Sequence, residues 1–163
     1  LVVRVHPEFL AGQRLPENGF GKTPGSPKFW EERLEAIADH ERHLARSGIK
    51  LMKFFLHVSK EEQKQRQLER IDDPSKNWKF NARDVEERAF WDDYMGAYEE
   101  AIRATAAPDA PWYVIPADRK WFMRLAVMAA TIAEMESLDL KFPELSDAAK
   151  AKLMTARKAL EAD

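Results

Sequence analysis

An apolar run that leads directly into a helix start is the feature that most constrains the fold. The run is IKLMKFFLHV, residues 49–58, and its length and composition are typical of a buried strand. The next residues, SKEE, form a capping box in which Ser59 caps a helix and Glu62 reaches back from its third position. Because a strand followed at once by a capped helix is the basic unit of α/β folds, the sequence predicts that class.

Further elements are predicted on both sides of this unit. Strands are expected at WYVI, residues 112–115, and over residues 1–5. Ser26 as N-cap, Pro27 in the first turn and Gly48 just past the end delimit one helix. Other helices are expected over residues 59–71, 81–105 and 119–137, and from Ser146 onward. The buried row of the helix over 119–137 is predicted to be Leu125, Met128, Ile132 and Met135.

Composition excludes several classes of protein. The chain has 163 residues, which suits one domain, and a formal net charge of −2 gives no general attraction to nucleic acid or to an anionic membrane. It contains no cysteine, so disulfides and thiolate metal sites are excluded and a cytoplasmic location is expected. No apolar run is long enough to cross a bilayer. The first residues, LVVRV, are not a usual chain start, and we expect a longer protein whose N-terminal part is missing here.

Four basic residues between positions 66 and 79 are candidates for binding phosphate. Arg66 and Arg70 are four residues apart and project from one face of the predicted helix, and Lys76 and Lys79 follow in the loop beside Trp78. Arginine binds phosphate oxygens bidentately and lysine supplies a mobile charge, so the four could clamp a polyanion. The alternative is that the two arginines pair with Glu62, Glu69 or Asp72 on a solvated face.

The loop after the second predicted strand, IPADRKW, is the other candidate region. Loops that leave the carboxyl ends of strands are where α/β folds place their ligands. Asp118 is expected either to cap the following helix or to contact a base. The four histidines form no convincing set of metal ligands, and no metal site is predicted from them.

The stretch GFGKTPGS, residues 19–26, has the look of a phosphate-binding loop but lacks its chemistry. The P-loop pattern G-x-x-x-x-G-K-[ST] needs a glycine where this chain has Pro16, and no apolar strand precedes it. Pro24 supplies no backbone N–H for a phosphate. We therefore predict a connector into the helix that Ser26 caps.

Three segments resemble the polyphosphate kinase 2 family, most closely its third class. They are IKLMKFFLHVSKEEQKQRQLERIDDPSKNWKF, ERAFWDDYMGAYEEAI and APWYVIPADRKWFMRL. The resemblance extends from Leu1 to about Pro143 and implies a thymidylate kinase-like fold, a three-layer α/β P-loop kinase core with a mobile lid. This chain would supply a partial, helix-rich portion of it. The implied domains are residues 1–145 and a helical extension over 146–163.

The resemblance also implies roles for individual residues. Arg66 and Arg70 would be catalytic contacts to phosphate, and Lys76 and Lys79 would bind phosphate from the lid loop. Ala117 and Asp118 would lie at the nucleotide. The implied reaction transfers a phosphoryl group between inorganic polyphosphate and an adenine nucleotide, AMP or ADP, and a homo-oligomer is expected.

Two motifs of the family are absent from this sequence. They are the loop G-x-D-x-x-G-K-x-G and an Asp-Arg or Asn-Arg that precedes a Ser-aromatic pair, and both lie upstream of LVVRV in the family. In family members these segments supply the phosphate cradle and the aspartates associated with Mg²⁺, so Mg²⁺ is expected to be bound mainly outside this chain. The alternative function is a non-catalytic module for polyanion binding or oligomerisation.

Overall fold

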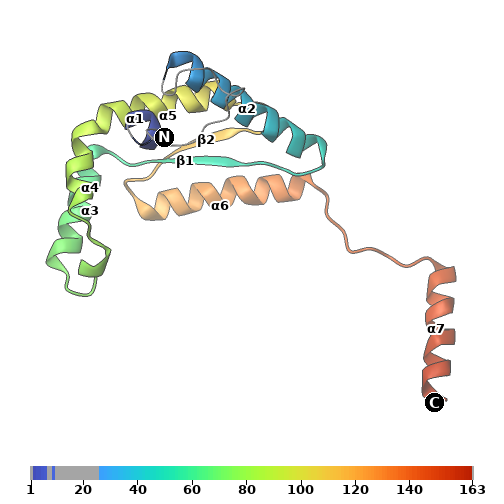
Figure 1. Cartoon of the computed structure of the whole chain (residues 1–163). Coiled ribbons are helices and arrows are strands. Elements are labelled where there is room, and N and C mark those ends of the chain that lie inside the picture. Colours follow the sequence, from blue (N-terminus) through green and yellow to red (C-terminus); the bar gives the residue numbers. More distant parts are fainter. Residues whose placement is uncertain (1, 7–8, 10–25, 163) are drawn as a thin grey trace. The chain divides into compact units, whose positions relative to one another are not determined.

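The computed structural model describes residues 2–6, 9 and 26–162 (Figure 1). The chain divides into two compact units, residues 1–128 and 129–163. Elements of the first unit are α1 (Val2–Val5), α2 (Pro27–Arg46), β1 (Lys53–His57), α3 (Lys60–Asp72), η2 (Asn77–Lys79), α4 (Arg83–Glu86), η3 (Glu87–Phe90), α5 (Trp91–Thr105) and β2 (Trp112–Pro116). Helix α6 (Lys120–Ser137) begins in the first unit and ends in the second, which also contains α7 (Asp147–Glu161).

Strands β1 and β2 form a two-stranded parallel sheet. Their register runs from Lys53 opposite Trp112 to His57 opposite Pro116. Each strand is five residues long, so β1 is shorter than the apolar run that predicted it. A parallel ladder needs a partner for every residue, and β1 extends only as far as β2 accompanies it. The prediction of an α/β unit is confirmed, because the helices between the strands form the crossover.

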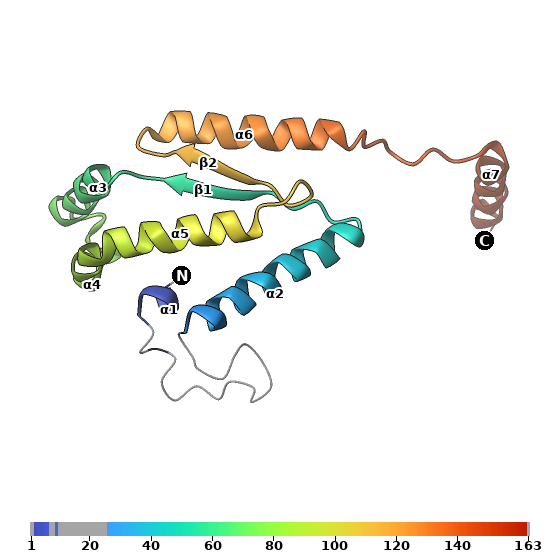
Figure 2. The same ribbon diagram turned by 90° about the horizontal axis from the view of Figure 1, so that it is seen from above.

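Helices α2 and α5 lie on one side of the sheet (Figures 1 and 2). Tyr98 of α5 packs its ring against Phe55 of β1, with centroids 4.6 Å apart. Lys53 of β1 points its ammonium group at Glu41 of α2 and donates a 2.7 Å hydrogen bond to the Thr105 carbonyl at the end of α5. Among the residues that the structure describes, the buried apolar side chains are Phe29, Trp30, Ala97, Ala110, Ile115 and Ala117.

The predicted limits of α2 are confirmed. Ser26 Oγ accepts the Phe29 N–H at 3.2 Å, and Pro27 occupies the first helical position. Gly48 follows the helix with φ of +83°, in the left-handed region where a residue without Cβ is favoured. The predicted cap of the last helix is also confirmed, since Ser146 Oγ accepts the Ala149 N–H at 3.3 Å.

Residues 1–5 were predicted to be a strand, and this is wrong, because Val2–Val5 form helix α1. Strand propensity expresses a fit to a pleated neighbour, and the described sheet contains β1 and β2 alone. Helix α1 contacts α5 instead, and its Arg4 pairs with Glu100 at 3.0 Å.

The helix predicted over residues 81–105 is divided into three pieces. Asn81 Oδ1 accepts the Arg83 N–H at 3.0 Å, but the N-cap is Ala82 and the first piece begins at Arg83, so the predicted start at Asn81 is not the helix cap. The last piece ends at Thr105 as expected. Between them, the 3₁₀ turn η3 separates α4 from α5. The i→i+3 hydrogen bonds of such a turn interrupt the regular α-helix.

The row predicted to be buried on α6 is exposed. Leu125, Met128, Ile132 and Met135 keep between 48% and 60% of their surface accessible. The spacing correctly identified an apolar face, but a face is buried only where a second surface covers it, and each compact unit leaves these side chains open.

Two further predictions are not tested by the described structure, and a third concerns membrane spans. The connector GFGKTPGS lies, apart from Ser26, outside the described residues. The domain boundary after residue 145 stays a prediction. Within the part of the chain that the structure describes, no helix is both long and apolar enough to cross a membrane.

Candidate functional site

The carboxyl ends of the two strands bring two distant segments together. His57 ends β1 and lies opposite Pro116 of β2, and the Ala117 N–H donates to the His57 carbonyl at 2.8 Å. The residues that follow each strand, Ser59 at the start of α3 and Asp118 before α6, are therefore neighbours. This edge of a parallel sheet is where α/β folds bind ligands.

Arg66 lies between these two segments. Its Nε donates to Glu62 Oε1 at 2.8 Å, which is the pairing that the solvated-face alternative predicts. Its second amino group donates to the carbonyls of Ala117, at 2.7 Å, and Asp118, at 3.0 Å. Arg66 thus ties α3 to the loop after β2.

The carboxylate of Asp118 completes the same junction. Its Oδ1 accepts the Ser59 backbone N–H at 2.7 Å. This hydrogen bond is the largest cause that holds the pKa of Asp118 below its ordinary value of 3.8, and desolvation of the carboxylate opposes it. The predicted capping box is therefore half right: Ser59 Oγ accepts the Glu62 N–H at 3.1 Å, but Asp118 takes the N–H that Glu62 was expected to accept.

Arg66 and Arg70 line one cavity of about 290 Å³, as their spacing predicts. Its other lining residues are Val58, Gln63, Gln67, Asp84 and Glu87. Among the residues that the structure describes, no carboxylate forms an ion pair with Arg70, so the solvated-face alternative does not apply to it. An arginine in this state is available to bind an anion.

Glu87, a carboxylate of the cavity wall, is compensated by its neighbours. Its Oε2 lies 2.9 Å from His6 Nε2 and accepts the Tyr94 hydroxyl at 2.9 Å, and Arg83 lies 3.7 Å from its other oxygen. The contacts with His6 and then Tyr94 lower the pKa of Glu87. Burial, with Glu87 as the second cause, raises the pKa of Tyr94 to about 12.

The two lysines belong to a loop folded onto the end of α3. Lys76 pairs with Asp73 at 2.8 Å. This contact, together with hydrogen bonds from Ser75, lowers the pKa of Asp73 to about 2, and it raises the pKa of Lys76. Lys79 lies 4.9 Å from the ring centre of the exposed Trp78. Asn77 donates to the carbonyls of Arg70 and Ile71, both at 2.7 Å. Neither lysine lines the cavity of Arg66 and Arg70.

Two side chains of the site gave no signal in the sequence. Arg88 of η3 donates to the Lys60 carbonyl at 3.0 Å and contacts Gln63, which fastens the first turn of α3. Gln67 is 8% exposed and places its amide near the Asp84 carbonyl, at 3.5 Å. Both sit in strongly charged stretches where sequence patterns predict a solvated face.

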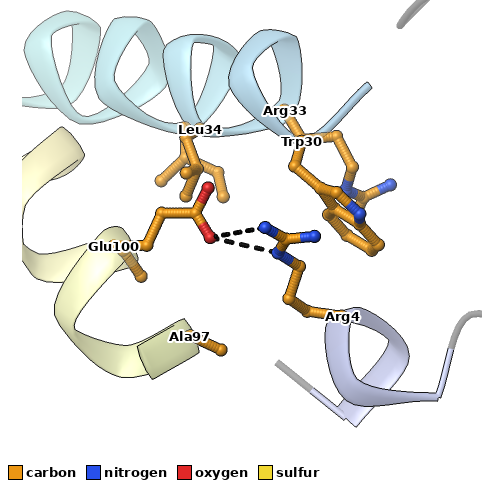
Figure 3. Close-up of a pocket in the computed structure, with 8 residues that line it drawn as sticks. Arg4, Trp30, Arg33, Leu34, Ala97 and Glu100 are labelled. Atoms are coloured by element: carbon orange, nitrogen blue, oxygen red, sulfur yellow. Dashed lines mark hydrogen bonds and ion pairs between the residues drawn. The ribbon is translucent and has the colours of Figure 1, made fainter. Parts of the chain in front are cut away.

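A second cavity, of about 200 Å³, lies between α1, α2 and α5 (Figure 3). Figure 3 shows the Arg4 guanidinium directed at the Glu100 carboxylate, with Trp30 beside it. Leu34 and Ala97 supply apolar wall. Because Glu100 already compensates the charge of Arg4, this arginine is not available to an anion as Arg70 is.

The described residues do not fit a Mg²⁺ site. In the described ranges no group of three His, Cys, Asp or Glu side chains could hold a metal ion. No step of the chemistry below is therefore assigned to a metal held by these residues.

Known proteins match this fold and this sequence. Residues 23–143 match the family model of Polyphosphate kinase 2 (PPK2), and the chain belongs to that family. It is 46% identical over 161 residues to an ADP-polyphosphate phosphotransferase of Rhodopseudomonas palustris, covering 98% of this chain and 54% of that protein. It is also 46% identical over 115 residues to an AMP/ADP-polyphosphate phosphotransferase of Meiothermus ruber, covering 71% of this chain and 43% of that protein.

The solved structure of Polyphosphate Kinase 2 from Arthrobacter aurescens TC1 superposes with a TM-score of 0.78 at 37% identity. The match covers 96% of this chain and 50% of that one. The predicted fold class, a P-loop kinase-like α/β fold present as a helix-rich part, is confirmed. The chain spans about half the length of these relatives.

Proposed function

We propose that this chain is part of a phosphotransferase that moves a phosphoryl group between inorganic polyphosphate and AMP or ADP. The relatives named above are polyphosphate phosphotransferases. The observation that carries the proposal in this chain is the cavity beside α3, where Arg70 has no carboxylate partner among the described residues. In our proposal the chain supplies the lid and the nucleotide side of the site.

In the forward reaction, an oxygen of the terminal phosphate of ADP attacks the terminal phosphorus of polyphosphate. A P–O bond to ADP forms, the P–O bond to the rest of the polymer breaks, and the products are ATP and a polyphosphate shorter by one unit. The protein contributes mainly position and positive charge to such a transfer. Arg70 would bind the oxygens of the phosphate in transfer or of its neighbour.

The other proposed contacts are arranged around Arg70. Arg66, held by Glu62 and the loop after β2, would fix the position of α3 relative to that loop. It would present its remaining N–H groups to phosphate. Lys76 and Lys79 would contact the more distant phosphates of the polymer from the lid loop. Ala117 and Asp118 would lie beside the nucleotide. The bound Mg²⁺ would be held outside this chain, and assembly into a homo-oligomer is part of the proposal.

The test is Arg70→Ala in the full-length protein. We expect kcat/KM for polyphosphate-dependent phosphorylation of ADP to fall about 100-fold, because a charge-assisted contact made in the transition state is lost. Arg157→Ala is the control, since Arg157 pairs with Glu161 on the exposed surface of α7. A kcat/KM within about threefold of the wild-type value would show that Arg70 does not contact the reacting phosphates.

A second candidate function for the 163 residues alone is polyanion binding without turnover. The observation that favours it is the sequence itself, which contains Arg70 and the lid lysines but no G-x-D-x-x-G-K-x-G loop. A phosphotransfer assay on this chain separates the two functions.

A further inference from the structure

The junction between the two strand ends joins the predicted phosphate side of the site to its nucleotide side. On one side stands the first turn of α3, the helix that carries Arg66 and Arg70. On the other stands the loop of Ala117 and Asp118. The Ala117 N–H donates to the His57 carbonyl, which places this loop directly beside the residues that lead into α3.

Asp118 takes the place that Glu62 would have in a capping box. Glu62 would normally accept the N–H of the cap residue. Here Asp118 Oδ1 accepts the Ser59 N–H at 2.7 Å, and Glu62 is free to hold Arg66 at 2.8 Å. The helix start is therefore anchored by a residue 59 positions away in the sequence.

Arg66 makes a second connection between α3 and the loop after β2. It donates to the carbonyls of Ala117 and Asp118 from about two turns beyond Ser59. A shift of the loop after β2 consequently pulls on α3 at two points, the Ser59 amide and the Arg66 guanidinium. Arg70 lies one turn beyond Arg66, so its position follows that of the helix.

We propose that Asp118 is a positioning residue, whose carboxylate holds the start of α3 so that nucleotide-side movements reach Arg66 and Arg70. The proposal rests on the proposed function and assigns the Asp118 side chain to α3 instead of to the base of the nucleotide. The lowered pKa of Asp118 agrees with it, because the Ser59 N–H is the largest cause of that shift.

The test compares Asp118→Ala with Asp118→Asn in the full-length protein. The amide oxygen of asparagine accepts the same N–H, so it retains the contact that alanine removes. Asp39→Ala is the matched control, because Asp39 is a surface aspartate of α2 that pairs with Arg42. Two measurements are made on each variant: hydrogen–deuterium exchange of peptides that contain the Ser59 amide, and kcat and KM for ADP and GDP with polyphosphate.

We expect Asp118→Ala to speed exchange at Ser59 about tenfold and Asp118→Asn to restore most of the protection. We expect Asp118→Ala to lower kcat about tenfold, with KM for ADP changed less than about threefold and the ratio of ADP to GDP turnover unchanged. Asp118→Asn should recover most of that kcat.

Three results would overturn the positioning role. They are unchanged exchange in Asp118→Ala, no recovery in Asp118→Asn, and a large rise in KM with an altered preference between ADP and GDP, which would make Asp118 a base contact. Exchange does not depend on turnover. If the wild-type protein failed to phosphorylate ADP, the proposed function would fail, while the exchange result would still decide the role of Asp118.

Discussion

At the scale of single residues, the site is determined by which charges are compensated. Arg66 and Arg70 have the same chemistry and line the same cavity, yet Arg66 pairs with Glu62 and binds two carbonyls. Spacing predicted that both would share a face, but it could not assign their partners. Two partners of Arg66, the carbonyls of Ala117 and Asp118, belong to a segment that lies beside α3 because β1 pairs with β2.

The loop between α3 and η2 offers a prediction that depends on pH. Asp73 accepts from Lys76 and from Ser75, and its pKa falls from 3.8 to about 2. Because the folded-state pKa is lowered, its stabilising contribution is complete above 3.8 and is lost as the pH falls from 3.8 toward 2. Carbon-13 NMR titration of the Asp73 carboxyl should give a midpoint near 2, and Lys76→Gln should move that midpoint upward.

Lys79→Gln is the control for this titration. Lys79 is not among the groups that shift Asp73, so its replacement should leave the midpoint in place. A wild-type midpoint near 3.8 would contradict the contact between Asp73 and Lys76.

At the scale of elements, local signals predicted helix ends better than helix continuity. Ser26, Ser59 and Ser146 all cap as predicted, because the cap hydrogen bond joins residues three apart. No local sequence signal of this kind predicted the 3₁₀ turn η3 inside the stretch 81–105. Its Arg88 reaches the Lys60 carbonyl, a contact across 28 positions that no local pattern contains.

Gly48 provides a test of one helix end. Its φ is +83° and a Cβ would meet no atom within 4 Å, so Gly48→Ala should destabilise the fold by about 1 kcal/mol through the backbone alone. Gly96 of α5 is also open around its Cβ position but lies inside a helix. Gly96→Ala should therefore leave stability unchanged or raise it by about 0.5–1 kcal/mol.

Urea unfolding of the two variants measures both effects. The expected outcome is a lower free energy of unfolding for Gly48→Ala and an unchanged or higher one for Gly96→Ala, since the same methyl group is added to two different backbone conformations. Equal destabilisation by both substitutions would contradict a conformational cause at Gly48.

At the scale of the whole molecule, the chain exposes surfaces that its own described residues leave open. The sheet has two strands, and the apolar row on α6 is exposed. An apolar face is buried only where a second surface covers it, so further packing against the exposed α6 row is expected in the full-length protein. The half-length match to the Rhodopseudomonas palustris and Arthrobacter aurescens proteins agrees with this expectation.

The corresponding prediction concerns activity of the 163 residues alone. With Mg²⁺, polyphosphate and ADP, we expect no turnover, because the sequence has no G-x-D-x-x-G-K-x-G loop to hold the transferring phosphates. We expect polyphosphate to bind, and to bind more weakly as salt is added, because the contacts are between charges. Production of ATP would contradict the first expectation, and binding insensitive to salt would contradict the second.

By itself, the sequence determined the α/β class, the helix caps, the shared face of Arg66 and Arg70 and the resemblance to a family. These depend on residues close together in the chain or on extended similarity. Only the tertiary structure decided the helical state of residues 2–5, the exposure of the α6 row and the pairing of Asp118 with Ser59. The physical reason is the same for all three: burial and hydrogen bonding depend on which distant segment lies opposite, and local pattern does not contain that segment.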